Sequence, residues 1–389
     1  MGWVFEDFEL DMDAFELRRA GETVPAEPQV LSLLFLFAEN RNRLLTKDEI
    51  VEKIWDGRAI SDAALSSRIK SARQLLGDDG KQQRFIKTVH GKGFRFVGDV
   101  APSPYGAQAS AADQRATDPD AGPEQEIRFF ADRNGTSIAY SLSGSGPVLI
   151  SPPWWVTHVE ADWNVPDVRR FYATVGRGHT LVRYDRPGTG LSDPIEAPFT
   201  FESEVALFED VVAELDAENI SILGLSCSGP VAIYHAANHP GQVEKLCFFG
   251  AYANGPAISP PEVQKAMLSS IKAHWGLGSR QIADAFLPDL EREQVLEFAN
   301  QLRRAADAET AAAMLKLVYQ LDATDCLARV KAPTLIMHRR GDRAVPFSEA
   351  RDMAKHIAGA TLIPLEGRAH SPWYDDGKIA EKLHDFLVS

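Results

Sequence analysis

The spacing of hydrophobic residues over the first hundred positions changes from strand-like to helical and back again. Short alternating pieces over residues 3–25 predict a small antiparallel sheet, with turns at Asp11–Asp13 and Gly21–Glu22. Helical patterns then cover residues 28–39, 46–55 and 61–76. The next segment, RFIKTVHGKGFRFVG, predicts a β-hairpin because its central glycines tolerate the positive φ angles of a tight turn.

Local signals mark where these three helices begin. Pro28 stands at the start of the first helix, and Thr46 with Glu49 forms a capping box at the start of the second. The third helix opens with Ser61 and has one apolar face, made of Leu65, Ile69, Ala72 and Leu76. Its opposite face is polar and consists of Ser66, Ser67, Lys70, Ser71, Arg73 and Gln74.

From residue 126 the pattern becomes a repeated alternation of strand, turn and helix. An opening hairpin is followed by the buried strands PVLISPP, ISILGLS, APTLIMHRRGD and ATLIPLEGRAH. This alternation predicts an α/β domain with a mostly parallel sheet that helices cover on both faces. Functional groups are then expected beyond the carboxyl ends of the strands.

Residues 101–125 separate the two patterns. They are rich in Ala, Pro, Gly, Asp and Gln, contain one aromatic residue and show no apolar period. Such a segment buries too little surface to offset the entropy lost on ordering, so we predict a flexible linker. The chain then divides into an N-terminal domain at residues 1–100 and a larger domain at residues 126–389.

Charge is distributed unevenly along this acidic chain, whose formal net charge is −14. Residues 1–39 carry nine acids and two bases, whereas residues 66–95 carry eight bases and two acids. A local basic stripe is typical of a DNA-binding face, because only the docking surface needs to meet phosphate. A solvated helix face is the alternative explanation of the charge alone.

Cysteine usage and hydropathy restrict the class of protein further. Three cysteines at Cys227, Cys247 and Cys326 form neither a CxxC pair nor a disulfide framework. No run of 18 apolar residues occurs, and the acidic N-terminus lacks the basic region of a signal peptide. We therefore expect a cytoplasmic protein without disulfide bonds, metal or organic cofactor.

The N-terminal domain resembles the OmpR/PhoB-type winged helix-turn-helix. The segments LTKDEIVEKIW, ISDAALSSRIKSARQLLGDD and FIKTVHGKGFRF carry this resemblance. It implies that the third helix enters the major groove of double-stranded DNA and that the hairpin, or wing, meets the minor groove or backbone. The candidates for the groove are Ser67, Arg68, Lys70 and Ser71, and those for phosphate are Arg73, Lys87, His90, Lys92 and Arg95. A winged helix used for protein contact is the alternative.

Three strand ends of the larger domain carry Ser226, Asp342 and His370, in that order. A serine hydroxyl becomes nucleophilic when an imidazole accepts its proton and a carboxylate orients the imidazole. We assign Ser226 as nucleophile, His370 as base and Asp342 as orienter. Ser228 replaces the second glycine of G-x-S-x-G and is the alternative nucleophile.

The order of these residues, with RYDRPGTGLSD, GLSCSGPVAIYHAANHPGQVEKLCFFGAYANG and APTLIMHRRGDRAVP, resembles the α/β-hydrolase family, and in particular its members fused to bacterial regulatory modules. The backbone N–H groups of Cys227 and Trp154 are the candidate oxyanion hole, because Pro152 and Pro153 have none. We read Asp185 and Arg186 as turn-fixing.

A helical cap over residues 252–331 is predicted to cover the active site. Trp154, Trp155 and His158 are the candidate pocket residues beside the strands. The cap contributes a set of apolar residues, of which a few line the pocket and the rest form its core: Met267, Ile271, Trp275, Phe286, Phe298, Met314, Leu317 and Tyr319. Such a lining predicts an apolar ligand or acyl group.

Two functions compete on this evidence. The first is a one-component transcription regulator, expected to be a homodimer, whose hydrolase-like domain senses a small apolar ester, lactone or related ligand and possesses at most slow hydrolytic activity. The second is a serine hydrolase (an esterase, lactonase or thioesterase) with an accessory DNA-binding domain. A binding module without activity is disfavoured, because all three residue types of the triad are present.

Overall fold

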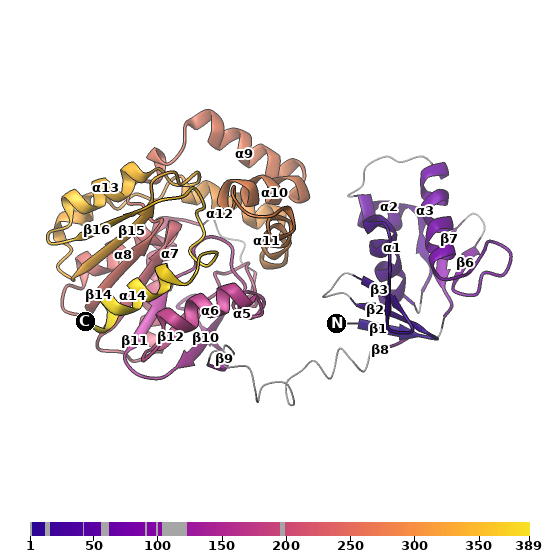
Figure 1. Cartoon of the computed structure of the whole chain (residues 1–389), viewed down its shortest axis with the longest axis horizontal. Coiled ribbons are helices and arrows are strands. Elements are labelled where there is room, and N and C mark those ends of the chain that lie inside the picture. Colours follow the sequence, from indigo (N-terminus) through magenta and orange to yellow (C-terminus); the bar gives the residue numbers. More distant parts are fainter. Residues whose placement is uncertain are drawn as a thin grey trace. The chain divides into compact units, whose positions relative to one another are not determined.

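The computed structural model describes residues 2–389 except 12–15, 42, 56–61, 90–91, 99, 103–122 and 195–198. The chain forms two compact units that divide between residues 118 and 119. Most of the predicted linker, residues 101–125, lies outside the described residues. Its two ends belong to strands, because Ala101–Pro102 forms β8 and Gln125 begins β9 (Figure 1).

A five-stranded antiparallel sheet opens the N-terminal unit, in the order β4-β3-β2-β1-β8. Its remaining strands are β1 (Gly2–Phe5), β2 (Phe8–Asp11), β3 (Glu16–Arg19) and β4 (Glu22–Val24). The predicted sheet is therefore present. Its first alternating segment, residues 3–10, is divided into two strands by a turn at Glu6–Asp7. The β3–β4 turn is at Ala20–Gly21, one residue before its predicted place, and residues 12–13 of the other predicted turn lie outside the described residues.

Three helices follow, as the pattern predicts. They are α1 (Pro28–Glu39), α2 (Lys47–Trp55) and α3 (Asp62–Leu75). The capping box is formed: the Thr46 N–H donates to the Glu49 carboxylate over 2.8 Å, and the Glu49 N–H donates to the Thr46 hydroxyl over 3.1 Å. All four residues of the predicted apolar face of α3 are buried, at 2 % exposure or less. Ser61, the predicted start of α3, lies outside the described residues.

The wing is the last part of the N-terminal unit. Strands β5 (Leu45–Thr46), β7 (Gly93–Phe96) and β6 (Ile86–Val89) pair in that order, all antiparallel. Gly93 has a φ of +148°, and a Cβ there would lie 2.0 Å from the Leu45 carbonyl oxygen, so only glycine lets β5 and β7 approach. Phe96 of the wing packs edge-on against Phe5 of the first sheet, with ring centroids 5.4 Å apart.

An eight-stranded sheet forms the centre of the second unit, in the order β16-β15-β14-β13-β11-β12-β10-β9. The strands are β9 (Gln125–Ala131), β10 (Ser137–Gly144), β11 (Val148–Ser151), β12 (Thr180–Tyr184), β13 (Ile220–Leu225), β14 (Val243–Phe249), β15 (Thr334–Arg339) and β16 (Thr361–Leu365). Only the two pairings of β10 are antiparallel. The prediction of a mostly parallel sheet is confirmed.

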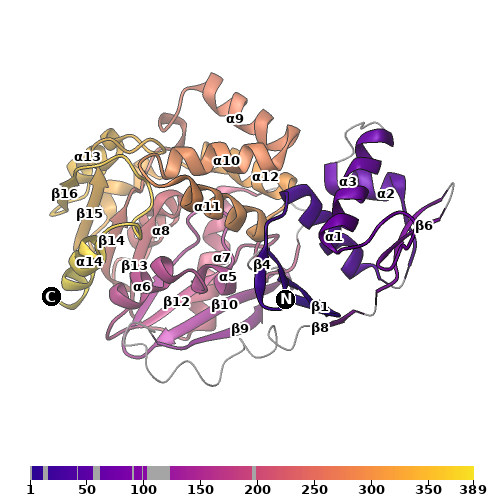
Figure 2. The same cartoon turned by 45° about the vertical axis from the view of Figure 1, so that its right-hand side comes forward.

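Helices cover both faces of this sheet (Figure 2). Helices α6 (Pro166–Val175) and α14 (Lys378–Val388) share one apolar core with residues of the strands. Helices α7 (Phe201–Glu214), α8 (Gly229–Asn238) and α13 (Phe347–His356) share the core on the other face. Side chains on both faces explain why β13 is buried along its whole length.

Four helices between β14 and β15 form the cap: α9 (Pro261–Ala273), α10 (Trp275–Phe286), α11 (Arg292–Ala305) and α12 (Ala308–Val318). The cap is shorter than the predicted 252–331, because the 3-10 segment Thr324–Arg329 packs against α8 and buries Cys326 and Leu327 in the core of the sheet. In the described part of the chain, no helix is long and apolar enough to cross a bilayer.

Candidate functional site

Ser226 lies on the sharp turn between β13 and α8, within the 3-10 segment Ser226–Ser228. Its φ of +50° is in the left-handed region that L-residues rarely adopt, so the backbone is strained there. The flanking glycines are sterically required. A Cβ on Gly224 would lie 2.7 Å from the Phe248 ring, and a Cβ on Gly229 would lie 2.5 Å from the Tyr252 carbonyl oxygen.

Ser228 is completely buried and its hydroxyl is used inside the turn. The hydroxyl donates to the Leu225 carbonyl oxygen and accepts from the Leu225 N–H, each over 2.8 Å. A hydroxyl that closes the turn in this way is not presented to a ligand. The geometry therefore favours Ser226 over Ser228 as the nucleophile.

Asp342 and His370 lie together, although 28 residues separate them in sequence. Asp342 Oδ2 is 2.7 Å from His370 Nδ1, and Asp342 Oδ1 accepts the backbone N–H groups of Ala344 and Val345. His370 Nε2 is buried without a hydrogen-bond partner in the described part of the chain. His370 and Ser226 line the same narrow pocket, so the free Nε2 is on the serine side of the site.

Gly250 makes room for this histidine. Its φ is +59°, and a Cβ there would lie 2.9 Å from His370 Cε1 and 3.6 Å from Asp342 Oδ2. Gly250 follows β14 directly, so the carboxyl ends of β13, β14 and β15 all contribute to one site. This is the edge of the sheet at which functional groups are expected.

A second imidazole, which the sequence reasoning missed, contacts the same carboxylate. His338 is fully buried on β15, with its Nε2 2.9 Å from the Val345 carbonyl oxygen and 3.5 Å from Asp342 Oδ2. Burial lowers the pKa of His338 and favours the neutral ring, whose Nε2–H donates to Val345. The available signal was a histidine inside an apolar strand four residues before the aspartate.

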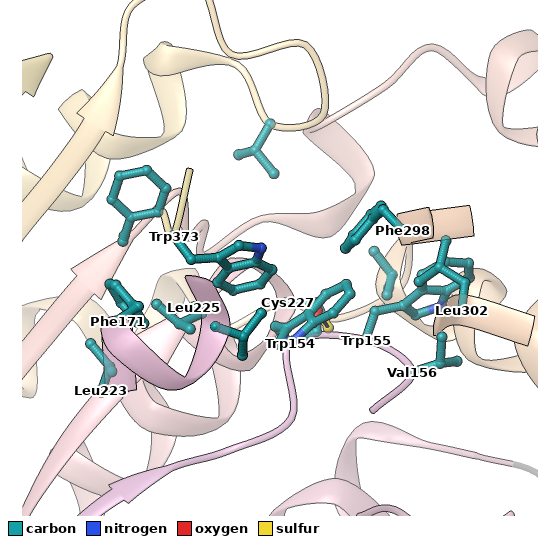
Figure 3. Packing of buried hydrophobic residues seen from close by; sticks show 14 of the residues in the cluster. Trp154, Trp155, Val156, Phe171, Leu223, Leu225, Cys227, Phe298, Leu302 and Trp373 are labelled. Carbon is teal, nitrogen blue, oxygen red and sulfur yellow. Dashed lines mark hydrogen bonds between the residues drawn. The ribbon is translucent and has the colours of Figure 1, made fainter. Parts of the chain in front are cut away.

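A buried network joins the candidate oxyanion loop to the turn at Ser226. The Cys227 thiol donates to the Trp154 carbonyl oxygen over 2.8 Å. The Arg186 guanidinium donates to the Trp155 carbonyl oxygen over 2.6 Å and pairs with the buried Glu204 carboxylate. Figure 3 shows Trp154, Trp155 and Cys227 side by side in the core. These contacts fix the two segments against each other, and the use of the Trp154 and Cys227 N–H groups as donors stays a prediction.

Asp185 also acts within the fold. Its buried carboxylate accepts from the Thr157 hydroxyl and from the N–H groups of Val159 and Leu191, each over 3.0 Å. The turn packs so closely that a Cβ on Gly190 would lie 2.0 Å from Asp185 Oδ2. Both Asp185 and Arg186 are therefore used inside the fold, as the sequence reading expects.

Ser226 lines a cavity between the sheet and the cap. Apolar and aromatic side chains dominate its lining: Trp154, Trp155, Cys227, Tyr252, Ile258, Val263, Met267, Ile282, Ala285, Phe286, Leu315, Val318, Tyr319, Ala344 and Val345. The Trp154 ring packs against the rings of Phe298 and Trp373, with ring centroids 5.8 Å apart in each pair (Figure 3). The cavity therefore suits an apolar ligand.

His158 does not line this cavity, and its assignment to the pocket is wrong. It is the N-cap of the short helix α5 (Val159–Trp163), where its Nδ1 accepts the Ala161 N–H over 3.3 Å. A helix that begins so soon after β11 uses the imidazole to satisfy its first N–H groups. Burial lowers the pKa of His158, which keeps this acceptor unprotonated.

Three of the eight cap residues named from sequence line the cavity: Met267, Phe286 and Tyr319. Ile271, Phe298, Met314 and Leu317 are buried in the core that the cap shares with the sheet. Trp275 packs against this core, and its indole N–H donates to the Ala306 carbonyl oxygen over 2.8 Å. The sequence-based division between a few lining residues and a larger core is therefore correct.

The exposed polar face of α3 and the wing is the candidate DNA-binding surface. Ser67 and Lys70 are exposed on α3, and Lys87, Lys92 and Arg95 are exposed on the wing. Ser71 and Arg68 are half-buried, and Arg68 forms an ion pair with Glu27. His90 lies outside the described residues.

Arg73 is not part of this surface, which corrects its assignment to phosphate. Only 9 % exposed, it donates through Nη2 to the Ile86 carbonyl oxygen over 2.6 Å and to the Thr88 hydroxyl over 2.9 Å. Its position on α3 faces β6, so the guanidinium fastens the wing to the helix. The sequence reading missed this role because Arg73 bonds to a strand residue 13 positions later. The pattern of polar residues along one helix does not show such a contact.

The fold and the site define the class of protein: a winged-helix DNA-binding unit joined to a hydrolase-type sheet, with a serine turn, a His–Asp pair and a helical cap. The chain belongs to the alpha/beta hydrolase family, whose model matches residues 142–382. Residues 21–96 match the model described as "Transcriptional regulatory protein, C terminal", so the N-terminal unit is a DNA-binding regulatory domain of the OmpR/PhoB type.

Relatives of known name match one unit or the other. The AB hydrolase superfamily protein YisY of Bacillus subtilis is 26 % identical over 65 % of this chain and 94 % of its own length. The transcriptional regulator HilA of Salmonella typhi is 30 % identical over 26 % of this chain but only 19 % of its own length. An esterase from Exiguobacterium antarcticum has the same fold, with a TM-score of 0.61 and 22 % identity over 68 % of this chain and all of its own.

Proposed function

We propose that the chain is a transcription regulator whose hydrolase-fold domain binds a small, mainly apolar ligand, such as an ester, a lactone or a related compound. The observation that carries this proposal is the covalent union of an OmpR/PhoB-type domain with a capped apolar cavity that reaches Ser226. Ligand binding between sheet and cap would change the cap, and through it the spacing or dimerisation of the DNA-binding domains. The regulator acts as a homodimer in this proposal.

The hydrolase reading is the second candidate, and the strained turn at Ser226 together with the 2.7 Å His370–Asp342 contact favours it. In this reaction His370 takes the proton of the Ser226 hydroxyl, and the oxygen attacks the carbonyl carbon of an ester. Asp342 holds the imidazole in the tautomer that leaves Nε2 free to accept. The N–H groups of Cys227 and Trp154 would stabilise the oxyanion.

The acyl-enzyme then forms as the alcohol leaves with the proton from His370. Water, activated by the same imidazole, releases the acid and restores Ser226. Slow turnover of this kind is compatible with sensing, because hydrolysis of the ligand would reset the signal.

A fluorophosphonate probe distinguishes the two readings in the full-length chain. Labelling that Ser226→Ala abolishes and Ser228→Ala retains identifies Ser226 as a working nucleophile. Absence of labelling, with a ligand that still alters DNA affinity, leaves the receptor function alone.

DNA binding is tested on the DNA upstream of the chain's own gene, over a range of salt concentrations. Binding that weakens steeply with salt supports the regulator, because phosphate contacts release counterions. No binding at any salt concentration contradicts it.

A further inference from the structure

Among the described residues, Arg343 is the one charged residue that lines the cavity at Ser226. It directly follows Asp342 in sequence, but the carboxylate of Asp342 is already engaged by His370 and by the N–H groups of Ala344 and Val345. No carboxylate in the described part of the chain lies within ion-pair distance of Arg343. The lining of an otherwise uncharged cavity that reaches Ser226 thus includes one exposed positive charge, which forms no ion pair with the described carboxylates.

Arg343 also lines a second, more open pocket beside the cavity. Arg280 and Arg292 lie in that second pocket, and Asp284 is the only acidic residue in its lining among the described residues. Neither arginine has an ion-pair partner within the described ranges. Three arginines and one aspartate give this region a local charge of about +2, whereas the whole chain has a net charge of −14.

Helix α10 separates the two pockets. Ile282, Ala285 and Phe286 line the cavity, whereas Arg280 and Asp284 line the second pocket from the opposite face of the same helix. Arg343 is the lining residue that the two pockets share. The nearby Asp289 pairs with Arg368, and Arg343 also helps to lower the pKa of its carboxyl, although Arg343 forms no ion pair with it.

The geometry points to an amphipathic ligand: an apolar acyl chain in the cavity, with its carbonyl group at Ser226, and an anionic group, carboxylate or phosphate, at Arg343 and the arginine pocket. Guanidinium groups bind such anions through paired, charge-assisted hydrogen bonds. This inference rests on the proposed ligand-binding role of the cavity and narrows its substrate class to esters with an acidic end.

Matched p-nitrophenyl esters test this class on the full-length chain. Each acidic ester (the monoester of adipate, suberate or sebacate) is compared with the neutral ester of equal acyl length, hexanoate, octanoate or decanoate. We expect kcat/KM for the best acidic ester to exceed that for its neutral partner by about tenfold, the usual size of one charge-assisted contact. A preference for the neutral ester at every length overturns the inference.

Variants assign the preference to the arginines. Arg343→Gln is expected to lower kcat/KM for the acidic ester about tenfold and for the neutral ester less than twofold. The double variant Arg280→Gln/Arg292→Gln is expected to act in the same direction. Arg351→Gln is the matched control, because this exposed arginine on α13 lines neither pocket. Equal losses for both esters in Arg343→Gln overturn the inference.

A binding experiment separates this inference from catalysis. If no ester is hydrolysed, the hydrolase candidate fails, and Ser226→Ala is then titrated with octanoate, octyl phosphate and octan-1-ol. Tighter binding of an anion than of the alcohol, lost in Arg343→Gln, supports the anionic ligand, and the preferred anion identifies carboxylate or phosphate. Equal binding of all three contradicts it.

Discussion

At the scale of single residues, Ser228 differs most from what the hydrolase motif leads one to expect. Its hydroxyl occupies the place of the usual glycine and makes reciprocal 2.8 Å hydrogen bonds with the backbone of Leu225. The sequence indicates a crowded turn at this position, and the structure shows that the serine is an internal bridge of the turn. Ser226 therefore keeps its half-buried position on the turn although a serine replaces the second glycine of the motif.

Replacement of Ser228 tests this bridging role. Ser228→Ala leaves the buried Leu225 N–H and carbonyl without the hydroxyl, so we expect a loss of about 1–3 kcal/mol in the free energy of unfolding. Ser228→Gly restores G-x-S-x-G but also lacks the hydroxyl, so we expect it to lose stability as well. Urea unfolding measures both, and fluorophosphonate labelling at Ser226 is expected to persist in each. Loss of labelling in both variants, with unchanged stability, would assign the serine to the chemistry.

Asp162 gives a second prediction, on pH dependence. Burial raises the pKa of its carboxyl from 3.8 to about 6, and the positive charge of Arg183 opposes this rise only in part. Between these pH values the folded chain keeps a proton that the unfolded chain has lost, so stability falls as pH rises through this window. Asp162→Asn imitates the protonated form. We expect it to stabilise the chain on the order of 2 kcal/mol at pH 7.5 and to have little effect at pH 4.

Thermal and urea unfolding at the two pH values check the sign of this effect. Asp167→Asn is the control, since this aspartate at the start of α6 forms only an exposed ion pair with Arg170. A stabilisation by Asp162→Asn that is equal at both pH values would contradict the assigned pKa.

At the scale of elements, the sequence predicted most of the helices, the parallel strands, the cap and the residues at three strand ends. Local periodicity and capping residues were sufficient, because each of these features depends on neighbours within a few positions. The turn at Glu6–Asp7, the capping role of His158 and the contact of His338 with Asp342 were missed. The last contact depends on how the chain after β15 turns back, which a pattern within one strand cannot show.

Arg73 and Lys87 provide a pair for the third prediction, because Arg73 contacts the two wing residues that flank Lys87. Arg73→Gln removes buried hydrogen bonds to Ile86 and Thr88, so we expect the N-terminal unit to lose about 1–3 kcal/mol of stability. Lys87 is exposed on β6. Lys87→Gln is expected to leave stability unchanged and to reduce the salt dependence of DNA binding by about one counterion.

Unfolding followed by circular dichroism and DNA titration at several salt concentrations measure the two effects separately. If Arg73→Gln reduced the salt dependence without loss of stability, the assignment of Arg73 to phosphate would be restored.

At the scale of the whole molecule, one chain joins a DNA-binding domain to a ligand cavity. The proposed regulation requires that binding of the ligand and binding of DNA are thermodynamically coupled. If a ligand in the cavity changes the affinity for DNA by a given factor, DNA must change the affinity for the ligand by the same factor. Octylboronic acid is a suitable probe, because boron adds reversibly to a serine hydroxyl. It combines this bond at Ser226 with an apolar chain in the cavity.

We expect DNA affinity to change by about 5–150-fold when the probe saturates the full-length chain, the usual range of allosteric coupling. Calorimetric titration of the probe with and without DNA should give the same factor. Ser226→Ala, which cannot bond boron, controls for effects of the probe outside the cavity. If the probe binds tightly but both affinities stay constant, the two domains act independently, and the DNA-binding domain then serves only to place a hydrolase on DNA.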